Sequence, residues 1–81
     1  MEKRIAILGI IIEDTESVSL VNELLHEYRE HIIGRMGMPY KEKEISVISV
    51  VMDATNDVIS ALSGKLGMLK GVNAKAVYSK K

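Results

Sequence analysis

The residues best suited to binding chemistry lie in one short stretch of the chain, residues 34–40, which reads GRMGMPY. Its glycines would let a ligand or another backbone approach closely. Arg35 could pair with a carboxylate or a phosphate, and Tyr40 carries an amphipathic ring suited to an interface. The stretch also fits an edge strand loosened by glycine and ended by proline. The candidate ligand or partner contacts are Gly34, Arg35, Gly37, Pro39 and Tyr40.

A second group of residues has the spacing of a metal site. Asn22, His26 and Glu30 recur every four residues, so they would share one ridge of a helix, and His31 follows directly. Two such ridges meeting across an interface could hold a metal ion through His26, Glu30 and His31. An ordinary solvated helix face explains the same pattern. The metal hypothesis would make the protein a metal sensor.

Other chemistry finds little support in the residues. The absence of cysteine excludes disulfides, iron–sulfur ligation by cysteine and thiol catalysis. No nucleophile–base pair or pair of carboxylates has a recognisable catalytic context, so an enzyme is not expected. Eleven acidic and eleven basic residues leave no net charge, which argues against binding nucleic acid. No apolar stretch is long enough to cross a bilayer, so a cytoplasmic protein is expected, and the residues imply no particular cofactor.

The elements that must position these residues follow from the hydrophobic pattern. Strands are predicted where apolar residues alternate or run together, and helices where they recur at helical spacing. The order is strand 4–12, helix 16–28, strand 31–40, strand 44–53, a helix capped by Thr55 or Asn56, and strand 72–79. Right-handed crossovers would place both helices on one face of a four-stranded antiparallel sheet. The predicted fold is therefore α+β, a ferredoxin-like βαββαβ two-layer sandwich forming a single domain over residues 1–81.

The predicted sheet has an unusually apolar second face. Strands 4–12 and 44–53 are largely aliphatic at both alternating sets of positions, whereas a solvated face should be polar. A domain this small would then expose a large apolar patch, which indicates a dimer or tetramer, although strand-rich sequences are often simply hydrophobic. The sequence does not decide which set faces outward. The candidate interface residues are Ile5, Ile7, Ile48, Val50 and Met52.

Four stretches of the chain carry a resemblance to a known family: IIIEDTESV, LLHEY, GRMGMPY and ALSGKLGMLKGV. Together they resemble the short proteins named as regulators of iron-only hydrogenase systems. The resemblance implies a domain like the amino-acid-binding ACT domains and the C-terminal domain of nickel-responsive repressors, which form ligand-gated oligomers. The histidines and cysteine of the nickel repressor's metal site have no matching set here. Only residues 1–3 precede the first strand, so direct binding to DNA is not expected.

These observations lead to one main hypothesis and two alternatives. The main hypothesis is a non-enzymatic, homo-oligomeric regulatory module that binds a small ligand or a partner protein. Its pocket would lie at a subunit interface near residues 34–40 and the first strand–helix loop, residues 13–15. The alternatives are an assembly factor that docks a hydrogenase maturation protein through the apolar sheet face, and the metal sensor.

Overall fold

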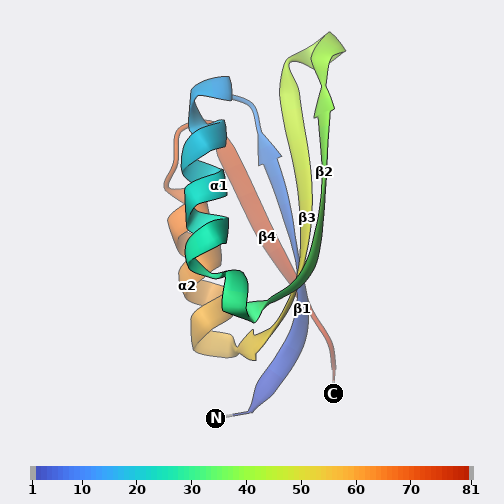
Figure 1. Ribbon diagram of the computed structural model, residues 1–81, viewed down its shortest axis with the longest axis vertical. Helices are drawn as coiled ribbons and strands as arrows, with labels where there is room; N and C mark the ends of the chain where they lie inside the picture. Colours follow the sequence, from blue (N-terminus) through green and yellow to red (C-terminus); the bar gives the residue numbers. More distant parts are fainter. Residues whose placement is uncertain (1, 81) are drawn as a thin grey trace.

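Two helices cover one face of an antiparallel sheet in the computed structural model, which describes residues 2–80 (Figure 1). The four strands are β1 (Lys3–Ile12), β2 (Ile32–Tyr40), β3 (Ile45–Thr55) and β4 (Val72–Tyr78). The helices are α1 (Val18–Glu27) and α2 (Asn56–Gly67), and three short 3₁₀ turns are η1 (Thr15–Ser17), η2 (Arg29–His31) and η3 (Lys41–Lys43). This order confirms the predicted ferredoxin-like α+β fold.

The strand order is β2-β3-β1-β4, so the two most apolar strands are the central ones. Strand β1 pairs with β3 from Lys3 opposite Thr55 to Ile12 opposite Ser46. Strand β2 carries Pro39, which lacks a backbone N–H, and it lies at a sheet edge where that loss is tolerated. The prediction of an edge strand over this stretch is confirmed.

The hydrophobic core lies between the sheet and the helices. Its strand contribution comes from alternate positions, because successive side chains of a strand point to opposite faces. The helices contribute one stripe each. The fully buried large side chains are Leu8, Ile10, Ile12, Val21, Leu25, Val50, Met52, Ile59, Leu62 and Leu66.

The register of β1 and β3 corrects the predicted interface. Ile5 lies opposite Asp53 and Ile7 opposite Val51, and residues that lie opposite each other share a face. The alternate residues of β3, Met52, Val50 and Ile48, therefore face the helices. Accordingly, Ile5 and Ile7 are 42% and 45% exposed, whereas Ile48, Val50 and Met52 belong to the buried core. Placing those last three at a subunit interface was wrong.

Side-chain caps begin η1 and α2, whereas the N-cap of α1, Ser17, makes no side-chain capping hydrogen bond. The Asp14 carboxylate accepts a hydrogen bond from the Glu16 backbone N–H at 2.9 Å, which begins η1. The Thr55 hydroxyl accepts one from the Val58 N–H at 3.4 Å, which begins α2. None of the helices within residues 2–80 is long and apolar enough to span a membrane.

Removing the cap of α2 should lower stability modestly. Thr55→Ala leaves the Val58 N–H without its side-chain acceptor, at an expected loss of about 1 kcal/mol of unfolding free energy. Thr55→Ser keeps the hydroxyl and should retain most of the stability. Urea unfolding followed by circular dichroism measures both. Equal losses of unfolding free energy in the two variants would show that the Thr55 methyl group stabilises the fold and that the capping hydrogen bond does not.

Candidate functional site

The stretch GRMGMPY forms most of β2, and its residues lie on two different surfaces. In the register with β3, Arg35 lies opposite Val50, Gly37 opposite Ile48 and Pro39 opposite Ser46, so these three positions face the helix layer. The intervening positions, Gly34, Met36, Met38 and Tyr40, face away from the helices. The five predicted contacts therefore do not form one site, because a strand presents alternate residues to opposite sides.

On the helix side, β2 and α1 form a hollow of about 240 Å³. The Arg35 Nη2 donates a hydrogen bond to the Asn22 Oδ1 at 2.8 Å, which joins the edge strand to the helix. The complete lining is Val18, Asn22, Arg35, Gly37, Met38, Pro39, Ser46 and Ile48. Three of the five predicted contacts, Arg35, Gly37 and Pro39, thus meet here.

The first strand–helix loop was expected to share this hollow but lies elsewhere. The Glu13 N–H donates to the Gly71 carbonyl at 2.7 Å, and the buried Ser17 hydroxyl donates to the Lys70 carbonyl at 2.6 Å. The Lys70 Nζ also lies 3.5 Å from the Asp14 Oδ2. These contacts hold the loop against the chain between α2 and β4, so it does not line the Arg35 hollow.

The face of the sheet away from the helices, called here the outer face, is apolar across all four strands. Met36 and Met38 project from β2 with 73% and 61% of their surface exposed. The other exposed apolar side chains of this face are Ile5, Ile7, Ile11, Tyr40, Val47 and Val77. Of these, sequence reasoning identified only Ile5, Ile7 and Tyr40. The others follow from the register, which the sequence pattern alone does not fix.

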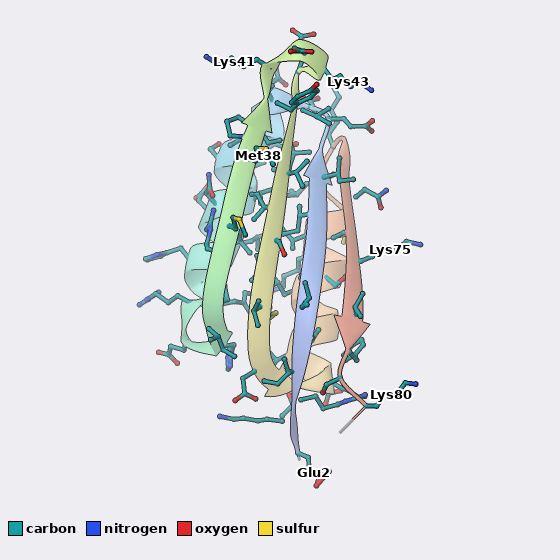
Figure 2. All side chains as sticks on the ribbon, turned by 90° about the vertical axis from the view of Figure 1, so that its right-hand side faces the viewer. Glu2, Met38, Lys41, Lys43, Lys75 and Lys80 are labelled. Atoms are coloured by element: carbon teal, nitrogen blue, oxygen red, sulfur yellow. The ribbon has the colours of Figure 1, made fainter. Side chains whose placement is uncertain are left out.

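Charged side chains lie around the outer face rather than across its middle. Figure 2 views this face and shows Lys41 and Lys43 at one end, Glu2 and Lys80 at the other, and Lys75 directed away from the edge at β4. Near the middle, Gly9 leaves a hollow of about 360 Å³ lined also by Ile11, Val47 and Lys75. An apolar centre with a charged rim is the usual arrangement of a protein–protein interface.

The predicted metal residues do not form one ridge. Helix α1 ends at Glu27, where the Tyr28 N–H bonds to the Leu24 carbonyl, and Glu30 and His31 lie in η2 instead. Within residues 2–80, no three histidine, cysteine, aspartate or glutamate side chains are grouped as a metal would require. A metal site shared between two copies of the chain stays a prediction.

A third surface feature is the groove between α1 and α2, with a volume of about 390 Å³. The Lys65 Nζ lies 5.2 Å from the centre of the Tyr28 ring. Its hydrogen bond and charge interaction with the Tyr28 side chain raise the pKa of Lys65. The groove lining is Leu20, Glu23, Leu24, Glu27, Lys65, Met68 and Leu69. Its rim carries charges of both signs, so it selects no particular partner.

Comparisons with known proteins agree with the fold and the resemblance. A family model described as "TM1266-like: Iron-only hydrogenase system regulator, putative" matches residues 4–76. Among solved structures, the chain is similar to the uncharacterized protein TM1266 from Thermotoga maritima, with a TM-score of 0.93 and 44% sequence identity. That alignment covers 98% of this chain and 100% of the other. No curated protein matches the chain.

Proposed function

This chain belongs to the TM1266-like family, and we propose that it is a non-enzymatic regulatory module of an iron-only hydrogenase system that works as a two-fold dimer. The regulatory role rests on the family description. The dimer rests on one structural observation, the apolar outer face of the sheet.

The size of the outer face supports burial against another protein. Its eight exposed apolar side chains range from over a third to nearly three quarters exposed and come from all four strands. Together they form a patch of several hundred square ångströms, the size that usually marks an interaction site.

A second copy of the chain suits this face better than a partner of one charge sign. The face carries Asp53 as well as Lys3 and Lys75 around its apolar centre, and the whole chain has no net charge. Two copies would therefore not repel each other. The projecting side chains of Met36 and Met38 and the hollow at Gly9 give one surface both protrusions and a recess, as self-complementary packing requires.

Native mass spectrometry and light scattering of the purified chain test the proposal directly. The wild type should be a dimer at micromolar concentration. Ile7→Asp places a carboxylate in the middle of the apolar contact, twice per dimer, and should weaken association at least about a hundredfold. The matched control is Leu20→Asp on α1, because Leu20 is 47% exposed and lies in the helix layer. That variant should remain a dimer.

Two outcomes would contradict the dimer. A monomeric wild type would remove the argument for a second copy and leave the outer face to a different protein, such as a hydrogenase maturation protein. A dimer that is lost in Leu20→Asp but kept in Ile7→Asp would place the contact on the helix layer instead.

A further inference from the structure

The hollow beside Arg35 has the features of a binding site for a small anion. Of the three arginines, Arg4 donates to the Ser79 carbonyl and lies over the Tyr78 ring, and Arg29 donates to the His26 carbonyl. Arg4 also donates to the Asn56 amide oxygen at 3.4 Å. Arg35 lines a hollow and donates to the Asn22 amide oxygen there. Among residues 2–80 the only ion pair lies elsewhere, between Lys70 and Asp14, so Arg35, like the other two arginines, has no carboxylate partner.

The guanidinium is both available and oriented. It has five N–H donors in a fixed plane, and the bond to Asn22 uses one of them. The same bond holds the side chain against α1, which lowers the conformational entropy lost when a ligand binds. Arginine recognises carboxylates through two parallel hydrogen bonds, and the remaining donors allow that geometry.

The rest of the hollow suits a short apolar group attached to the anion. At Gly37 a Cβ atom would be in ordinary van der Waals contact with the Ile48 side chain at 3.8 Å and the Val47 carbonyl at 4.0 Å, so the glycine leaves that contact surface to a ligand. Val18 and Ile48 supply apolar walls, and Ser46 lies opposite Pro39 in the strand register. No acidic residue belongs to the lining, and Arg35 is its only charged residue.

From this arrangement we propose that the chain binds a small monocarboxylate in the hollow between α1 and β2, with the anion on Arg35 and its aliphatic part against Val18 and Ile48. One cation matches one negative charge, whereas a phosphate dianion is usually held by several donors or cations. The proposal of a small ligand rests on the proposed regulatory function, since a regulatory module responds to the binding of a ligand. Of the residues that line the hollow, only Met38 also belongs to the outer face, so a ligand on Arg35 leaves most of the contact between copies free.

Titration of the nitrogen-labelled chain with isovalerate, followed by NMR at constant ionic strength, tests this site. Saturable shifts are expected at the Gly37 and Ser46 amides and at the Arg35 side chain. The uncharged isovaleramide and inorganic phosphate should bind at least about tenfold more weakly than isovalerate, because each lacks one part of the recognised group.

Two variants separate Arg35 from general surface charge. Arg35→Gln should weaken isovalerate binding at least about tenfold, and since Arg35 is exposed the variant should fold, which circular dichroism checks. Arg29→Gln removes another exposed charge, one outside the hollow, and should leave binding unchanged. The carboxylate site is overturned by the absence of saturable shifts, by equal binding of isovaleramide or phosphate, or by equal losses in the two variants.

The same samples report separately on assembly. A wild-type dimer that does not bind isovalerate would overturn the carboxylate site and leave the dimer standing. A monomer that binds isovalerate through Arg35 would overturn the dimer and support the site.

Discussion

Val50→Asp should prevent the chain from folding, whereas Val51→Asp, one residue along the same strand, should leave it folded. Val50 is completely buried between the sheet and the helices. A carboxylate there would lose its hydration without gaining a partner, at a cost of several kcal/mol. The total stability of a domain this small lies near the lower end of the usual range of roughly 5–15 kcal/mol, so that cost is as large as the stability itself.

Val51 is half-buried and faces away from the helices, opposite Ile7 of β1. An aspartate at this position can reach water at the outer face of an isolated chain, so the core remains intact. Far-UV circular dichroism and urea unfolding measure both variants. A folded Val50→Asp beside an unfolded Val51→Asp would mean that the register is shifted by one residue. Unfolding of both would mean that the chain folds only when its outer face is covered.

Gly71→Ala is the second substitution with a large expected effect. Gly71 has a φ of +69°, in the left-handed region that costs other residues roughly 1–2 kcal/mol. A Cβ atom there would also lie 2.7 Å from the Asp14 Cβ and 2.8 Å from the Asp14 backbone nitrogen. The neighbouring Glu13 N–H bonds to the Gly71 carbonyl, so the two loops cannot separate without losing that bond. Backbone strain and steric overlap together should lower the free energy of unfolding of Gly71→Ala by about 2–4 kcal/mol.

Gly64→Ala is the matched control for this effect. Gly64 lies within α2, and a Cβ atom there has nothing within 4 Å. Alanine restricts the unfolded chain more than glycine does, so the free energy of unfolding of this variant should rise by roughly 0.5–1 kcal/mol. Urea unfolding of the two variants should shift the midpoint in opposite directions. Similar midpoints for Gly71→Ala and the wild type would show that the contact between the loops can relax.

The strands and helices could be predicted because their signals are local. The Ile-rich stretch of β1, the helical spacing of Val21 and Leu25 in α1, and the cap at Thr55 each act within a few residues. Their order then restricts the topology, since right-handed crossovers allow few arrangements. The helix predicted from Glu16 to about Tyr28 differs from α1 mainly at its start, where residues 15–17 form η1 instead, because helix ends depend on weak competing hydrogen bonds.

The candidate site could be located only roughly. The stretch GRMGMPY was recognised as unusual, and it does contribute to both surfaces described above. Which residues of this stretch face the hollow and which face outward depends on how β2 pairs with β3. The hydrogen bond from Arg35 to Asn22 depends on how α1 packs on the sheet. Asn22 had been grouped with His26 on one helical ridge, whereas its partner comes from a strand thirteen residues away.

By itself, the sequence determined which segments are strands and helices, because hydrophobic periodicity and capping are written in neighbouring residues. It also determined that both faces of β1 and β3 would be apolar, since both alternating sets of residues in these strands are largely aliphatic. Only the tertiary structure decided which apolar set forms the core, with Val50 and Met52 inside and Ile7 and Val51 outside. The physical reason is that alternation divides a strand into two faces, while the burial of one face is decided by the helices that pack on it.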